Sequence, residues 1–255
     1  MLWYKSWLET RWRFLIGLAL LMCTAATVVF AYPRVVKLLP MALTADVSSE
    51  LGRRIREAAE IQRTYRGYLW QQWFGQNLAN LLSIFAVVLG TGGLLSQASK
   101  GGALFTLSMP VSRIRILGVR AATGLGELLV LAFVPSLLLP LLSPIVGQSY
   151  GIGDALVHSG SIFVQGAALF SATFLLSTVF SDVWRPLLIV LCGAAVVAFC
   201  DQVFLGASQY SLFRIMSAES YFRGGGLPWL GLLAGALVSA AMLYGAAANI
   251  SRRDF

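Results

Sequence analysis

The sequence predicts an all-α, polytopic membrane protein, and two observations carry this prediction. Hydrophobic residues make up 58% of the 255 residues and charged residues only 12%, whereas a soluble domain carries about 25% charged residues. The charges gather between apolar runs that are long enough, or nearly so, to cross about 30 Å of hydrocarbon. Because runs of this length satisfy their backbone in lipid as helices, we expect one membrane domain, 1–255, with six transmembrane helices. The six runs lie at about 14–32, 72–95, 116–142, 158–180, 186–205 and 228–250.

The segment before the first run predicts an interfacial helix. Trp3 and Trp7 are four residues apart, Tyr4 and Leu8 likewise, and Lys5 falls on another face. Tryptophan and basic residues suit the headgroup layer. This N-terminal helix is interpreted either as a plain membrane anchor or as a docking surface for another protein.

A second amphipathic stretch, 46–70, precedes the second run. Apolar residues recur there at helical spacing, and opposite charges such as Arg56 and Glu60 are spaced four apart. We expect one helix that lies outside the membrane and runs towards the second span. Its charged face is interpreted as a solvated structural surface or, alternatively, as a contact for substrate or lipid.

The second span opens with four amide side chains, Gln72, Gln76, Asn77 and Asn80. Amides are costly in contact with lipid, so these side chains are expected to face a protein seam or a wet cavity. Two interpretations stay open: hydrogen bonds between helices, or the lining of a translocation path.

The loop before the third span combines a short apolar run with a proline and basic residues. Leu104, Phe105 and Leu107 give the predicted helix at 97–108 an apolar side, Pro110 ends it, and Arg113 follows. A helix of this kind at the membrane surface is suited to transmitting a movement of a soluble partner to the membrane helices. Within the third span, Glu127 is an intramembrane acid and is interpreted either as functional or as a paired structural residue, with no partner evident.

The sequence contains few residues that could carry catalysis. His158 is the only histidine and is read as an ordinary interfacial residue, so neither a zinc site of the H-E-x-x-H type nor a serine hydrolase is indicated. No lysine follows a Gly-rich loop of the P-loop type, so we expect no ATP binding in this chain. With a single histidine we also expect no metal site. Cys23, Cys192 and Cys200 are read as packing residues.

The distribution of basic residues favours cytoplasmic termini. Ten Lys and Arg residues would lie inside and nine outside, but seven of the nine fall in the long loop 33–70, several of them far from a span. Residues close to span ends and in short loops carry most of the orientation signal. We therefore expect both termini in the cytoplasm.

Two stretches resemble type-2 ABC transporter permeases. The stretch ALFTLSMPVSRIRILGVR, residues 103–120, is similar to the cytoplasmic loop of that family, where LL-x-LP-[VI]-[ST]-R recurs before the third span. The closing SRRDF, residues 251–255, is similar to the family's C-terminus. The sequence departs from the family's G-[RK]-E-x-G-T element, because Ser99-Lys100-Gly101-Gly102 stands in its place.

The resemblance implies a transmembrane permease subunit of an ABC transporter, of the exporter type, in a bacterial-type inner membrane. A separate ATPase subunit would bind ATP and Mg, and a second permease chain, identical or paralogous, would pair with this one. The helix at 97–108 would be the coupling helix that docks on the ATPase, and 206–227 would form short extracellular re-entrant helices. The alternatives are a non-transporting scaffold or channel subunit and an intramembrane enzyme.

Overall fold

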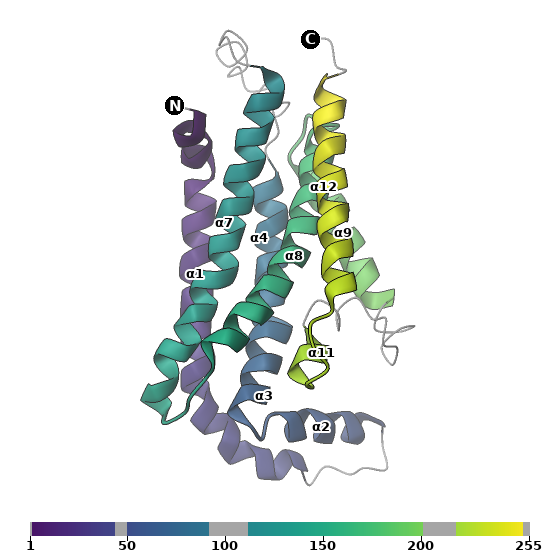
Figure 1. Ribbon diagram of the computed structural model, residues 1–255. Helices are drawn as coiled ribbons and strands as arrows, with labels where there is room; N and C mark the ends of the chain where they lie inside the picture. Colours follow the sequence, from purple (N-terminus) through teal and green to yellow (C-terminus); the bar gives the residue numbers. More distant parts are fainter. Residues whose placement is uncertain (1, 44–49, 92–111, 201–217, 252–255) are drawn as a thin grey trace.

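The computed structural model describes residues 2–43, 50–91, 112–200 and 218–251, and these residues form helices and connecting turns without a strand (Figure 1). Five helical stretches are long and apolar enough to cross a membrane: Leu2–Pro40, Tyr65–Gly90, Ile114–Val146, Ile152–Ser177 and Trp229–Ser251. These coincide with five of the six predicted spans. At the remaining one the structure describes a shorter apolar helix, α9 (Trp184–Cys200), so a six-span topology stays a prediction.

The long helices alternate in direction along the bundle. Helices α1 (Leu2–Leu43), α7 (Arg113–Leu142) and α9 run one way, and α4 (Ala79–Gly90), α8 (Ile152–Ser177) and α12 (Trp229–Ser251) run the other way (Figure 1). The start of α1 and the end of α12 therefore lie at the same end of the bundle, which we call the terminal end. The opposite end, which we call the far end, carries α2 (Glu50–Ile61), α3 (Tyr65–Leu69) and α11 (Glu219–Phe222).

The expected separate N-terminal interfacial helix is not observed, because residues 2–13 form the first turns of α1. Polar contacts hold these turns against the bundle. The Arg13 guanidinium donates to the Val88 carbonyl and to the Thr91 hydroxyl, both at 3.2 Å. Glu9 pairs with Arg120 of α7 at 3.5 Å. Residues with the composition of an interfacial anchor thus extend the first membrane helix.

The single helix expected at 46–70 is divided in two. Helix α2 ends at Ile61, and the Thr64 hydroxyl accepts a hydrogen bond from the Gly67 N–H at 3.1 Å to cap α3. A Cβ at Gly67 would collide with the Ile61 carbonyl oxygen, so glycine permits this tight change of direction. Within α2 the predicted Arg56–Glu60 pair is present at 3.6 Å. Residues 46–49 lie outside the described ranges.

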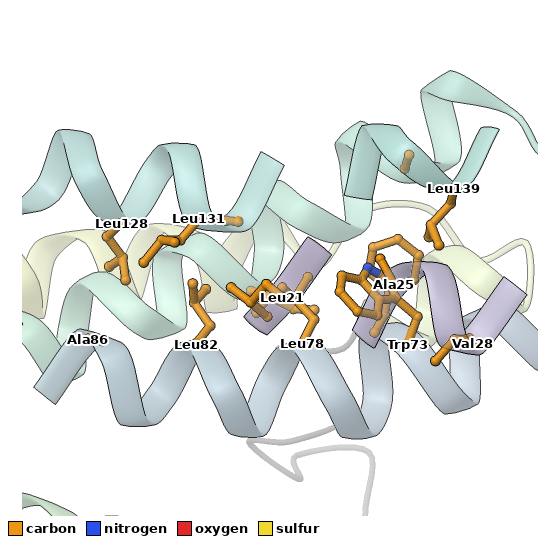
Figure 2. Close-up of a cluster of buried hydrophobic side chains, with 14 of the residues drawn as sticks. Leu21, Ala25, Val28, Trp73, Leu78, Leu82, Ala86, Leu128, Leu131 and Leu139 are labelled. Carbon is orange, nitrogen blue, oxygen red and sulfur yellow. The ribbon is translucent and has the colours of Figure 1, made fainter. Parts of the chain in front are cut away.

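The core lies where α1, α7 and α8 pack on the continuous helical stretch 65–90. Fully buried leucines from three of these elements meet there, together with Trp73 (Figure 2). The Trp73 indole N–H donates to the Ser136 hydroxyl at 3.1 Å. Glycines let α8 approach closely: a Cβ at Gly90 would lie 2.8 Å from the Phe170 carbonyl oxygen, and one at Gly166 would lie 3.3 Å from the Leu82 side chain. These contacts also define the register of α4 against α8.

Two further predictions concern segments that are described in part or not at all. The coupling helix at 97–108 lies outside the described residues. Of the segment 206–227, residues 206–217 also lie outside them, and the remainder contains the one-turn helix α11. A short helix is therefore present in this region, whereas its re-entrant character stays a prediction.

Candidate functional site

The amide-rich stretch of the second span is a π-helix rather than an α-helix. It is η1 (Trp70–Leu78), in which backbone hydrogen bonds join residues five apart. The Asn77 amide repeats this spacing and donates to the Gln72 carbonyl at 2.6 Å. Such π-turns are rare and often occur at functional sites. Three of the four predicted amides, Gln72, Gln76 and Asn77, thus lie in a helix that is wider than an α-helix.

The four amides occupy different environments. Gln72 and Asn77 are half-buried, whereas Gln76 and Asn80 are exposed on the isolated chain. Among the described contacts, none of the four side chains hydrogen-bonds to a different helix. The interpretation that they form hydrogen bonds between helices therefore has no contact to support it. The interpretation that they line a translocation path stays a prediction. One of the four, Asn80, lines a cavity.

Asn80 lines a cavity of about 590 Å³ that opens between α4, α8 and α9. Three lining residues are polar and uncharged, namely Asn80, Ser83 and Gln165. The remaining lining is aliphatic or glycine: Ile84, Ala168, Leu169, Ala172, Ile189, Val190, Gly193, Ala194, Ala195, Val197 and Ala198. A cavity of this size, largely apolar with a few polar groups, has the character of a small-molecule site.

The polar groups gather towards one end of the cavity. Because Gly166 lies against Leu82 and Gly90 against Phe170, Asn80 and Gln165 lie at nearly the same level. On α4 and α8 the apolar lining residues follow them towards the terminal end. Gln165 is only 9% exposed and forms no hydrogen bond with another residue in the described part of the chain. The side chain is thus mostly buried, and its amide is available to a ligand.

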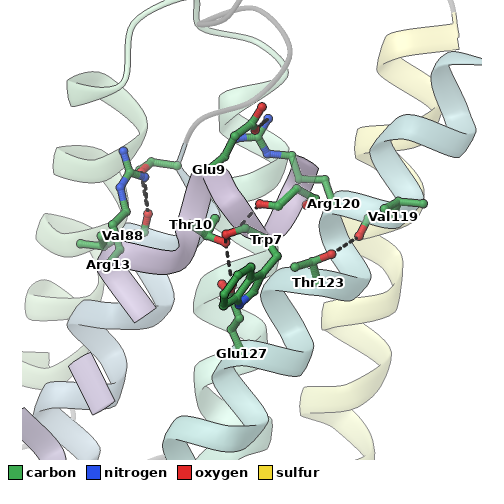
Figure 3. Close-up of polar contacts among 11 residues, drawn as sticks. Trp7, Glu9, Thr10, Arg13, Val88, Val119, Arg120, Thr123 and Glu127 are labelled. Carbon is green, nitrogen blue, oxygen red and sulfur yellow. Dashed lines mark hydrogen bonds and ion pairs between the residues drawn. The ribbon is translucent and has the colours of Figure 1, made fainter. Parts of the chain in front are cut away.

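Glu127 has a partner that sequence reasoning did not identify. The Thr10 hydroxyl of α1 lies 2.5 Å from Oε1 of this carboxyl group, and Thr10 is also within 3.3 Å of the Ser6 carbonyl (Figure 3). Glu127 is 6% exposed, and its Oε2 forms no hydrogen bond in the part of the chain that is described. The pairing was missed because Thr10 belongs to the segment that was expected to lie in the interface. The structure therefore places Glu127 in a contact between helices.

A second polar cluster lies at the far end. The Arg66 guanidinium contacts both carboxylate oxygens of Asp154, at 2.9 and 3.1 Å, and the Tyr221 hydroxyl donates to the same carboxylate at 3.1 Å. The Phe222 ring stacks on Trp70 with centroids 4.6 Å apart. These contacts connect α11 to α3, η1 and α8. Burial, and then the Asp154 carboxylate, raise the pKa of the Tyr221 phenol, so it stays a donor at neutral pH.

His158 is completely buried in the helical bundle, and its expected place at the membrane interface stays a prediction. Its ring lies between Phe74, at 4.9 Å, and Tyr221, at 5.6 Å. Nearby, burial raises the pKa of the Tyr150 phenol well above its ordinary value. The start of α8 at Ile152, rather than near 158, brings Asp154 and His158 into the bundle.

The predicted ATPase-docking residues fall mostly outside the described part of the chain. Leu104, Phe105, Leu107 and Pro110 lie there, whereas Arg113 is the first residue of α7. The preceding Ser112 caps that helix, and its hydroxyl accepts from the Arg115 N–H at 3.4 Å. The structure thus describes the start of α7 with Arg113, whereas the other four predicted docking residues lie outside the described ranges.

Among the described residues, no group of three or more His, Cys, Asp or Glu side chains is arranged to hold a metal ion. Comparison with known proteins adds no assignment: no protein-family model, curated protein or solved structure matches the chain.

Proposed function

We propose that this chain is the transmembrane permease subunit of an ABC transporter of the exporter type. A separate ATPase subunit binds ATP and Mg and drives it, and a second permease chain, identical or paralogous, completes the membrane part. In this proposal α9 forms the sixth span, and both termini face the cytoplasm of a bacterial-type inner membrane. The chain itself performs no hydrolysis.

The observation that carries the proposal is the position of the connection between α4 and α7. Helix α4 ends at Gly90 and α7 begins at Arg113, both at the terminal end (Figure 1). The chain therefore leaves α4 and enters α7 on the side of both termini, and the family-like stretch 103–120 ends within α7. This is the side on which the family resemblance requires the ATPase to dock.

The amide-bearing cavity supports a transport role. Asn80, one of the four predicted path residues, lines a half-open cavity beside α9. A transported molecule needs a site that it can enter and leave, and an open apolar cavity with few polar groups meets this need. The remaining path residues, Gln72, Gln76 and Asn77, precede it in η1.

Co-purification with the ATPase encoded by the neighbouring gene tests the proposal. Leu107→Asp places a charge on the predicted docking face, and it should lower recovery of the ATPase about tenfold or more, since a central interface residue is worth about 2 kcal/mol. Membrane insertion should persist. Ser149→Asp adds the same charge to an exposed turn at the far end and should leave recovery unchanged.

Two results would count against the proposal in different ways. If Leu107→Asp forms the complex normally and ATP hydrolysis is undiminished, the segment is not the docking site. If no ATPase is recovered with the unaltered chain, the assignment as a permease subunit is wrong.

A further inference from the structure

We propose that the cavity between α4, α8 and α9 binds an uncharged amphiphile with a linear aliphatic body and a small hydrogen-bonding head, for example a neutral glyceride. This inference rests on the proposed function and names its substrate class. It follows from the chemistry of the lining, the shape of the cavity and the position of its polar groups.

The lining excludes a charged ligand. None of the residues that form the described cavity is acidic or basic, and eleven of its fourteen lining residues carry no polar side chain. An ion transferred to such surroundings without a partner pays a large desolvation cost. Hydrogen bonds from amides and hydroxyls are sufficient for an uncharged head, but they do not offset that cost for a full charge.

The lining also favours an aliphatic body over an aromatic one. No Phe, Tyr or Trp is among the lining residues described, so a planar ring would find no stacking partner. Alanine and glycine at Ala168, Ala172, Gly193 and Ala194 leave a smooth surface. From Ile189 to Ala198 the lining follows α9 for about 13 Å, at about 1.5 Å per residue. A slot along the helices suits an extended alkyl chain.

The head of the ligand is assigned to the polar end. Gln165 is nine-tenths buried with no protein hydrogen-bond partner in the described residues, and Asn80 lies at its level on α4. The Ser83 hydroxyl donates to the Ala79 carbonyl at 2.6 Å and keeps its oxygen as an acceptor. Two amides and one hydroxyl oxygen can therefore satisfy a head that both donates and accepts.

Photo-crosslinking of the purified full-length chain in nanodiscs tests the inference without the ATPase. The probe is a monoacylglycerol with a diazirine in its acyl chain, and the comparison probe is the lysophosphatidic acid with the same chain. We expect saturable labelling of 80–84, 165–172 and 189–198 by the neutral probe, and about tenfold weaker labelling of these sites by the charged one. Tenfold corresponds to about 1.4 kcal/mol.

Paired variants separate the cavity from the lipid-facing surface. Ala194→Phe fills the cavity and should reduce site labelling about tenfold, whereas Cys192→Phe, on an exposed part of the same helix outside the lining, should not. Gln165→Leu removes the amide from the cavity lining and should weaken neutral-probe binding about tenfold, the loss expected for one hydrogen bond of about 1.4 kcal/mol. Gln148→Leu, in an exposed turn, is its control.

The inference is overturned if labelling spreads evenly over outward residues such as Leu230 and Leu237, which would indicate contact with bulk lipid only. Peptide mapping on the unaltered chain gives this result even if a variant does not fold. Equal labelling by both probes also overturns it. If the cavity is labelled as expected but no ATPase is recovered, the binding site stands and the transporter proposal fails. If the ATPase is recovered and the cavity is not labelled, the reverse holds.

Discussion

At the scale of single residues, the Thr10–Glu127 contact shows how a buried carboxyl group is accommodated. Glu127 receives one described hydrogen bond, at Oε1, from Thr10. Thr10, in contrast, also has the Ser6 and Trp7 carbonyls as acceptors, at 3.3 and 3.4 Å. The two partners therefore depend on this contact unequally, because a buried group left without a hydrogen bond is costly.

This inequality predicts an asymmetric mutational result. Thr10→Val should destabilise the protein by about 1–3 kcal/mol, because it leaves the Glu127 carboxyl group without its described hydrogen bond. Glu127→Leu should cost less, since the Thr10 hydroxyl can donate within α1. The double variant should resemble Glu127→Leu alone. Thermal denaturation in detergent, followed by size-exclusion chromatography, measures the order.

Thr24→Val is a matched control, because within the described residues the Thr24 hydroxyl bonds only to the Leu20 carbonyl of its own helix and is not buried. Its effect should be small. Equal losses for Thr10→Val and Glu127→Leu would show that Thr10 does not support the acid in this way.

At the scale of elements, glycine positions determine how closely the helices approach. At Gly90 a Cβ would lie 2.8 Å from the Phe170 carbonyl oxygen and 2.9 Å from the Thr173 Cβ. The first of these is a backbone atom, so it cannot move without shifting α8. A Cβ at Gly126 of α7, in contrast, would have no atom of the described residues within 4 Å. Gly90 is therefore needed for the close packing of α4 on α8, whereas Gly126 is not needed for a close approach in the described part of the chain.

Gly90→Ala should separate α4 from α8 and cost about 1–3 kcal/mol, as overpacking does. Gly126→Ala should be neutral or slightly stabilising, because alanine is the better helix former by about 1 kcal/mol. Midpoints of thermal unfolding in detergent compare the two. A Gly90→Ala midpoint at or above that of the unaltered chain would contradict the close packing of α4 on α8.

At the scale of the whole molecule, the alternating helices place successive turns at opposite ends of the bundle. Both ends of the described chain and the turn after α8 lie at the terminal end, whereas the turn before α8 lies at the far end (Figure 1). Ser181 and Ser149 are exposed in these two turns. They offer markers for opposite sides of the membrane.

Cysteine labelling in intact cells tests the proposed orientation. After Cys23, Cys192 and Cys200, all exposed on the isolated chain, have been replaced, Ser149→Cys should react with an impermeant maleimide and Ser181→Cys should not. Both should react once the membrane is permeabilised, which confirms that each thiol is reachable. The reverse pattern would place the termini outside and remove the docking assignment.

The sequence alone identified a large part of the architecture. Apolar length is a local property, because about 20 residues must cross the hydrocarbon, so five predicted spans coincide with long apolar helices. Other boundaries could not be predicted. Helix α2 ends at Ile61 because the chain turns back close to itself at Gly67, and residues 2–13 join α1 because Glu9 and Arg13 find partners on other helices.

For the candidate site, the sequence by itself determined the chemistry of the residues, and the tertiary structure decided their grouping. Hydropathy and spacing identified Asn80 and Glu127 as polar groups within apolar spans, because lipid penalises such groups wherever they occur. Only the packing of α8 beside α4 brought Gln165 level with Asn80, and only the packing of α1 brought Thr10 to Glu127. These pairs are separated by many residues along the chain, and helix-to-helix register depends on where small residues permit close approach.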